Sequence, residues 1–226
     1  MIGLNPESQW ASRSHIPALA ILSDEYEITG VANSNYKSAQ KAAAFFKIPK
    51  AYESASTLIH SEDNDLIVIT VRVPYHYELV KVALEAGKHV YCEHPLGNGI
   101  EETRDLAAIA ASKDVVAVVG TQMVVSPDVL YLEKLIREGY VGKVLSTTLI
   151  GSGGPSFTGE TVAANYYLSD KTNGATMLTI PLAHTLSGVM KVLGEYDILS
   201  SLMLNNFPDV KIRDTGETKP KQPKIR

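Results

Sequence analysis

Runs of apolar residues at two different spacings divide the first 145 residues into alternating segments. Short, nearly continuous apolar runs are typical of strands buried on both faces, and four of them predict strands: residues 28–32, 66–71, 88–92 and 115–119. The intervening segments predict helices: residues 10–22, 37–46, 75–86, 100–112 and 127–138. This alternation with short links predicts right-handed crossovers and a parallel sheet covered on both faces.

The pattern changes after Gly142. Residues 143–150 and 196–206 predict strands, residues 182–193 predict a helix, and the run Gly-Ser-Gly-Gly-Pro at 151–155 predicts a flexible stretch. The fold class is therefore α/β, with a doubly wound parallel sheet first and a second α/β domain after it.

These elements predict a first domain over residues 1–122 and a partial second domain over residues 123–208. From Asp209 the chain is charged and rich in proline, and it has no apolar periodicity. We therefore expect residues 209–226 to form a flexible tail.

The composition excludes several classes of protein. Of 226 residues, 45% are hydrophobic and 20% are charged, which is enough apolar material for a core and excludes disorder of the bulk. The 21 basic and 25 acidic residues give a net charge of -4, so we expect no direct nucleic-acid binding. We find no continuous apolar run long enough for a membrane span, so we expect no membrane partner.

The single cysteine, Cys92, excludes an internal disulfide and any site with several cysteine ligands. It lies on a predicted buried strand, where a thiol is inert. The first six residues lack the basic and apolar regions of a signal peptide, so we expect a reducing, cytoplasmic location. His76, His89 and His94 fall on different predicted elements, and we expect no metal site.

The loop from Gly3 to Ala11 is the first candidate for binding chemistry. In dinucleotide sites, glycines permit a tight turn and close approach of the pyrophosphate to a helix N-terminus. Here Gly3 is the only glycine, although Asn5 tolerates a left-handed backbone and can partly replace a second one. The alternative is an ordinary strand-to-helix turn. Only two residues precede Gly3, so either the first strand is very short or the chain is truncated.

The end of the next strand carries no carboxylate that could accept hydrogen bonds from an adenosine ribose. Ser34 is polar and neutral, and Lys37 is a nearby cation, which suits a 2′-phosphate and slightly favours NADP over NAD. A solvated turn is the alternative interpretation.

Glu93 and His94 follow a predicted strand at the carboxyl edge of the sheet, where ligands of such folds bind. His94 could relay a proton near neutral pH, while the alternative is a polar turn fixed by Pro95. His184 opens a mostly apolar helix and is either a second proton-transfer group or a structural histidine.

Taken in order, these segments resemble the Gfo/Idh/MocA oxidoreductase family. Residues 84–96 are similar to its "AGKHV-x-x-EKP-L" segment, and residues 139–144 are similar to its "G-x-I-G-x-V" entry into the second domain. The resemblance implies an N-terminal Rossmann domain that binds NAD(P), followed by a mostly antiparallel sheet with the substrate site. It also implies hydride transfer with a sugar-like or other alcohol substrate, and a possible homo-oligomer.

The chain departs from the family at the residues that carry the chemistry. His94 stands at the family's lysine, Arg72 stands at a proline, and Ile180 stands at the aspartate four residues before His184. The resemblance implies proton transfer by His94 and His184, with Tyr167 as a neighbour. It implies a set of residues around the dinucleotide: Gly3, Asn5, Ser34, Lys37, Arg72, Glu93 and His94.

Further segments resemble a fungal branch of the family that contains a galactose-gene repressor: residues 10–11, 151–154, 173–174, 184–185 and 205–208. This resemblance implies an alternative, a catalytically silent nucleotide-binding regulator that contacts a transcription activator and can be nuclear. Complete family members have further strands after the position of residue 206, so we expect a chain truncated at both ends.

Overall fold

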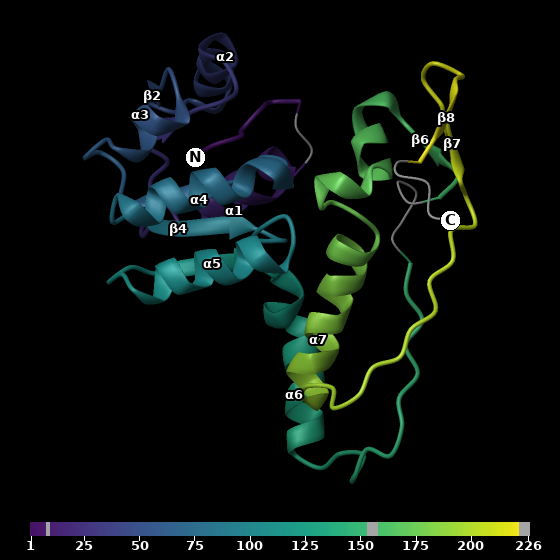
Figure 1. Ribbon diagram of the computed structural model, residues 1–226. Helices are drawn as coiled ribbons and strands as arrows, with labels where there is room; N and C mark the ends of the chain where they lie inside the picture. Colours follow the sequence, from purple (N-terminus) through teal and green to yellow (C-terminus); the bar gives the residue numbers. More distant parts are fainter. Residues whose placement is uncertain (8–9, 153–157, 222–226) are drawn as a thin grey trace. The chain divides into compact units, whose positions relative to one another are not determined.

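The computed structural model describes residues 1–7, 10–152 and 158–221, and the chain forms two compact units (Figure 1). The first unit is Met1–Gly120 and the second is Thr121–Arg226.

The first unit is built on parallel strands: β1 (Gly30–Val31), β2 (Lys50–Ala51), β3 (Leu66–Ile69), β4 (His89–Glu93) and β5 (Ala117–Gly120). β1 pairs with β2, while β4 lies between β3 and β5. Ile2 joins the two groups through parallel bridges to Ala32 and Ile69. With the short segment around Ile2 as the first strand, the order is 3-2-1-4-5-6, as in dinucleotide-binding sheets. The predicted doubly wound parallel sheet is thus confirmed.

The first strand of this sheet is the short segment around Ile2. The backbone N–H of Ile2 donates to Val68 O at 2.8 Å, and the N–H of Thr70 donates to Ile2 O at 3.0 Å. The α-amino group of Met1 donates to Gly30 O at 2.8 Å. Burial lowers the pKa of this amine to about 5, so it is uncharged at neutral pH.

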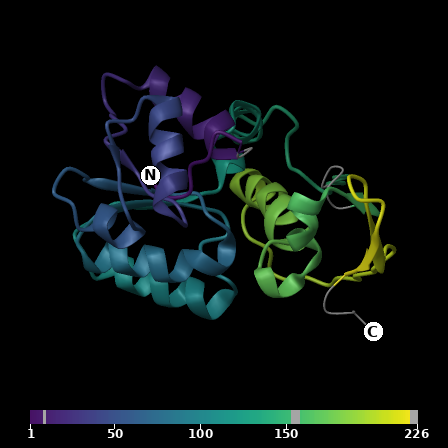
Figure 2. The ribbon, with the colours of Figure 1, turned by 90° about the horizontal axis from the view of Figure 1, so that it is seen from above.

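Helices cover both faces of this sheet (Figure 2). The helical elements of the first unit are η1 (Ala11–His15), α1 (Ile16–Ile21), α2 (Tyr36–Phe46), α3 (Ala55–Ile59), η2 (Val73–Tyr75), α4 (His76–Glu85) and α5 (Ile100–Ala111). Val90 and Cys92 of β4 share a core cluster with residues of α3, α4 and α5. Val68 and Tyr91 point to the other face and pack with residues of η1, α1 and α2. The alternation of side chains along β3 and β4 therefore builds both layers.

Among the elements of the first unit that the sequence did not predict are β2 and α3. A two-residue strand and a five-residue helix are too short to show a period in the apolar pattern. The signal for α3 is its capping box, in which Ser54 Oγ accepts from Thr57 N and Thr57 Oγ1 accepts from Ser54 N.

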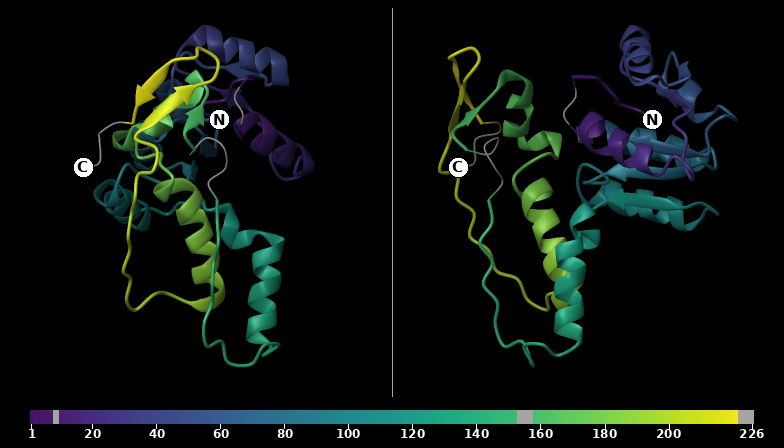
Figure 3. Two further views of the ribbon diagram at one scale, coloured as in Figure 1. Left: turned by 90° about the vertical axis from the view of Figure 1, so that its right-hand side faces the viewer. Right: turned by 180° about the vertical axis from the view of Figure 1, so that it is seen from behind.

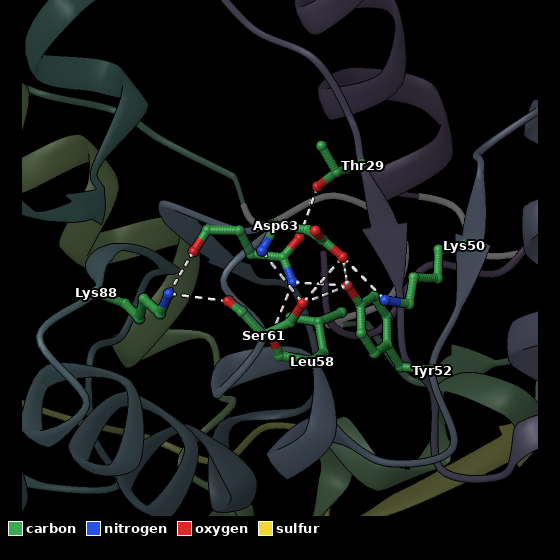
Figure 4. Close-up of polar contacts among 8 residues, drawn as sticks. Thr29, Lys50, Tyr52, Leu58, Ser61, Asp63 and Lys88 are labelled. Atoms are coloured by element: carbon green, nitrogen blue, oxygen red, sulfur yellow. Dashed lines mark hydrogen bonds and ion pairs between the residues drawn. The ribbon is translucent and has the colours of Figure 1, made fainter.

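A polar network closes the amino-terminal side of the sheet (Figure 4). Buried Asn64 donates to Leu58 O and to Tyr52 Oη, and its own oxygen accepts from Thr29 Oγ1 at 2.6 Å. Lys88 Nζ donates to Asn64 O at 2.7 Å and to a second backbone carbonyl at 2.9 Å. One amide side chain thus satisfies groups from three separate segments.

The second unit contains η3 (Gln122–Val125), α6 (Pro127–Arg137), η5 (Ala163–Ser169), η6 (Lys171–Asn173), η7 (Leu178–Leu182) and α7 (Ala183–Leu193). Its sheet is mixed, since β7 (Asp209–Ile212) pairs parallel with β6 (Glu160–Thr161) and antiparallel with β8 (Thr218–Pro220). Gly188 lets α7 approach η3, because a Cβ there would lie 2.7 Å from Met123 Cγ.

The structure differs from the expected flexible tail. Residues 209–220 contain the β7–β8 hairpin, in yellow in Figure 3, in which Val210 and Ile212 are buried between exposed neighbours. Tyr166 Oη donates to Pro220 O at 2.6 Å and ties β8 to η5. Residues 222–226 of the expected tail lie outside the described residues, as do residues 153–155 of the glycine-rich stretch.

The predicted strands at 143–150 and 196–206 are wrong in this structure. Both segments are described throughout, and they contain no strand and run as plain traces in Figure 3. Their side chains are mostly exposed, as in Leu145 (86%) and Ile198 (89%). A strand needs a neighbour for its backbone groups, and the described residues place none beside these segments.

The helical run Lys171–Leu193 is long and apolar enough to cross a membrane, with a mean hydropathy of 1.2 over an 18-residue window. A core helix of a soluble protein meets the same criterion. The expectation of no membrane span therefore stays a prediction.

We predict that Asn64→Leu destabilises the first unit by about 2–3 kcal/mol, because it leaves the partners of the amide unsatisfied at similar side-chain volume. Urea unfolding followed by circular dichroism measures the change. The matched control is Asn206→Leu at an exposed position. Equal midpoints for both variants would contradict the proposed role of the network.

Candidate functional site

The carboxyl ends of the parallel strands of the first unit gather the predicted dinucleotide residues at one edge of the sheet. Gly3 follows the first strand, Ser34 follows β1, Arg72 follows β3, and Glu93 and His94 end and follow β4.

Gly3 lies where this edge has no room for a side chain. It has φ +99°, and a Cβ there would lie 2.7 Å from Val71 Cγ1 and 3.0 Å from the Val71 backbone nitrogen. Thr70 Oγ1 donates to Ile2 O at 3.1 Å and to Gly3 O at 3.3 Å. The start of the loop is thus held against the end of β3 with no room for a side chain.

Asn5 does not replace a glycine in the way its sequence position indicated. Among the described residues, Lys47 is the one non-glycine with a positive φ, so Asn5 is not left-handed. Its Oδ1 instead accepts from Glu7 N at 3.0 Å, which closes an Asx turn within the loop. The turn is therefore stabilised by the hydrogen bond of the Asn5 side chain and not by a left-handed backbone at Asn5.

Asn33 belongs to this edge as well, although the sequence had pointed to its neighbour Ser34. Its Nδ2 donates to Leu4 O at 2.7 Å and to Ser38 Oγ at 3.1 Å, which joins the Gly3 loop to α2. Its Oδ1 is buried and has no hydrogen-bond partner among the described residues. Ser34 and Lys37 are exposed beside it. The signal in the sequence was the place of Asn33 just past the end of β1, where dinucleotide sites of this kind carry a carboxylate.

Glu93 hydrogen-bonds to His15, a second residue that was not predicted for the site. His15 Nε2 lies 2.5 Å from Glu93 Oε1, and the two side chains are 14% and 15% exposed. The His15 ring also meets the Tyr91 ring edge-on, with centroids 5.3 Å apart. Sequence spacing gave no signal, because the two residues are 78 positions apart.

His76 joins the loops that follow β3 and β4. It is 1% exposed, and its ring nitrogens hydrogen-bond to two backbone carbonyls, Nδ1 to Pro95 O at 2.8 Å and Nε2 to Val71 O at 2.9 Å. The peptide bond between His94 and Pro95 is cis. His94 is partly buried beside this junction, whereas Arg72 is exposed at the start of η2.

The other predicted catalytic residues belong to the second unit. Tyr167 lies in η5 and His184 lies in the first turn of α7, and both are partly buried. Their joint action with His94 of the first unit stays a prediction. No group of three or more His, Cys, Asp or Glu residues in the described parts of the chain could hold a metal ion.

Residues 1–121 match the Gfo/Idh/MocA family, described as an oxidoreductase family with an NAD-binding Rossmann fold. The chain belongs to this family. Residues 127–224 match the Gal80p C-terminal domain. The resemblance that the sequence motifs indicated is thus confirmed, together with the NAD-binding class of the first unit.

The relatives of this family member include enzymes and a regulator. The chain is 34% identical to the dehydrogenase aclE of Aspergillus oryzae over 196 residues, covering 86% of this chain and 53% of that protein. It is 26% identical to the galactose/lactose metabolism regulatory protein GAL80 of Saccharomyces cerevisiae, covering 94% of this chain and 51% of that protein. The chain thus spans about half the length of these relatives.

The solved structures that resemble this chain also include both a regulator and an enzyme. A super-repressor mutant of Gal80p from Saccharomyces cerevisiae superposes with a TM-score of 0.88 at 25% identity, covering 98% of this chain and 60% of that one. A levoglucosan dehydrogenase in complex with NADH and levoglucosan has a TM-score of 0.75 at 22% identity, covering 98% and 59%, and supports the fold alone.

Two features of the site fit the dinucleotide that the family implies. The first is Gly3, which starts the strand-to-helix loop where sheets of this kind bind a pyrophosphate, and where a Cβ would collide with Val71. The second is the buried Oδ1 of Asn33, an acceptor without a donor among the described residues. A ribose hydroxyl could supply that donor. The nucleotide would therefore extend from the Gly3 loop toward the end of β1.

Cys92 lies on β4 directly before Glu93. It is fully buried, and burial together with the neighbouring Glu93 charge raises the pKa of its thiol far above the ordinary value. It therefore takes no part in nucleophilic chemistry in the folded chain.

We predict that Cys92 of the folded chain reacts with a thiol-specific reagent at least about a hundredfold more slowly than in urea, because reaction requires opening of the sheet. The rate is measured from the absorbance of the thiolate that the reagent releases on reaction with Cys92. A folded chain that reacts as fast as the unfolded one would show that β4 is not held in the core.

Proposed function

We propose that the protein is an NAD(P)-dependent oxidoreductase that transfers hydride between the nicotinamide and a sugar-like or other alcohol substrate. The observation that carries the proposal is the Glu93–His94 pair at the end of β4, on the same sheet edge as the Gly3 loop. This edge is where doubly wound sheets bind dinucleotides. The dehydrogenases among the relatives support the reaction class.

The residues around the edge have distinct roles in this proposal. Gly3 and Asn5 shape the loop for the pyrophosphate, while Arg72 and Glu93 line the nicotinamide end. A bound nicotinamide supplies the hydride acceptor or donor, and the substrate hydroxyl exchanges a proton with a side chain. His94 is the first proton-transfer group, because an imidazole exchanges protons near neutral pH. The second candidates are His184 and Tyr167.

The choice of dinucleotide depends on the end of β1. Exposed Ser34 and Lys37 would suit a 2′-phosphate, which slightly favours NADP. The orphaned Asn33 Oδ1 accepts a hydroxyl equally well in NAD. We retain NAD(P), with NADP slightly favoured.

We expect saturable binding of NADPH and NADH, with the affinity for NADPH higher. Fluorescence of Trp10, the single tryptophan, reports the titration, because it stands at the end of the Gly3 loop. Lys37→Ala is expected to weaken NADPH binding about tenfold and leave NADH binding unchanged, since it removes the charge that would face a 2′-phosphate. A folded chain without any saturable signal would reject the dinucleotide site.

A second candidate function is a catalytically silent, nucleotide-binding regulator that contacts a transcription activator and is found in the nucleus. The match of residues 127–224 to the Gal80p C-terminal domain favours it. Ile180 favours it as well, because it cannot assist His184 as an acid partner would. This function predicts nucleotide binding without hydride transfer.

Measuring reduced nucleotide by its absorbance with a panel of sugars and polyols distinguishes the two functions. If turnover is found, we expect His94→Ala to lower kcat by about 10²-fold or more and to change the nucleotide Kd by less than about tenfold. His60→Ala, at the exposed end of α3, is the matched control. Unchanged turnover in His94→Ala would remove the proposed proton relay.

A further inference from the structure

We propose that His15 is a positioning residue for the dinucleotide site, because it fixes the carboxylate of Glu93 at the end of β4. The inference deepens the proposed function and rests on it. His15 ends η1, the first helical segment after the Gly3 loop, and Glu93 ends β4. Their contact therefore joins the two parts of the chain between which a dinucleotide would lie.

The chemistry of the two groups shows which of them donates the hydrogen bond. A carboxylate only accepts hydrogen bonds, so His15 Nε2 carries the proton and donates to Glu93 Oε1 at 2.5 Å. Charge-assisted hydrogen bonds of this kind are stronger than neutral ones. Both side chains are shielded from water to about the same extent, so competition from solvent is small.

A second contact holds the His15 ring in place. The Tyr91 ring, two residues before Glu93 on the same face of β4, meets the imidazole at an interplanar angle of 82°. Aromatic rings favour this edge-to-face arrangement. The His15 imidazole thus packs against Tyr91 and hydrogen-bonds to Glu93. Through these two contacts, the end of η1 and the end of β4 fix each other in position.

The consequence concerns the orientation of the Glu93 carboxylate. Loss of the donor at Oε1 would leave this partly buried oxygen to water and give the carboxylate more freedom to rotate. With His15 present, Oε1 has a donor and the orientation of the carboxylate is restricted. Glu93 can then meet the nucleotide in one orientation, which lowers the cost of binding.

The test is a double-mutant cycle on NADH and NADPH affinity, measured by calorimetry. We expect His15→Leu, which keeps the volume beside Tyr91, to raise the Kd about tenfold through the lost hydrogen bond. His15→Gln places an amide N–H at nearly the same reach and is expected to restore the affinity to within about threefold. In a Glu93→Met background, which removes the acceptor oxygen at similar side-chain length, His15→Leu is expected to add less than about threefold.

His60→Leu is the matched control, because His60 is exposed at the end of α3 and its ring hydrogen-bonds to Ser56 of the same helix. It is expected to leave the Kd unchanged. Should His15→Leu fail to fold, His15→Asn replaces it, because its amide is too short to reach Glu93. The expected result is then weaker binding for His15→Asn than for His15→Gln. Equal Kd values for these two variants would overturn the inference.

Two further results overturn it in different ways. If His15→Leu raises the Kd by the same factor in the unsubstituted chain and in the Glu93→Met background, the two residues act independently and His15 does not position Glu93. If the unsubstituted chain binds neither nucleotide, the proposed function fails and this inference fails with it.

Discussion

The whole first unit depends on the hydrogen bonds of one very short strand. Ile2 pairs with both Ala32 and Ile69, and without these bridges the sheet would separate into β1–β2 and β3–β4–β5. The same segment delivers Gly3 to the carboxyl edge, where contact with Val71 leaves no room for a side chain. The pairing that completes the sheet therefore also places the start of the candidate nucleotide loop.

Side chains, rather than backbone pairing, then connect the loops at this edge. Asn33 joins the Gly3 loop to α2, His76 joins the loops after β3 and β4, and His15 joins η1 to the end of β4. Each of these contacts uses a polar group that is at least partly shielded from water, so losing a partner is costly. These contacts fix the positions of the loops relative to one another in the structure.

Elements with a clear apolar period, such as the helices at 76–85 and 100–111, were predictable from the sequence, and so was the doubly wound order, because alternating strands and helices allow few topologies. Nothing in the spacing of His15 and Glu93 indicates that they meet. Strand propensity at 143–150 was misleading, since propensity forms no strand without a neighbour. The hairpin at 209–220 shows the converse: two apolar side chains at a spacing of two were enough once β6 offered an edge.

The two extended segments of the second unit, residues 143–150 and 196–206, have a consequence for how this chain behaves in solution. Each combines exposed leucines and isoleucines with backbone groups that pair with no strand in the described parts of the chain. Extended segments with unpaired backbone groups pair readily with the same segments of other molecules. Self-association of this chain is therefore expected to rise with its concentration, through these two segments.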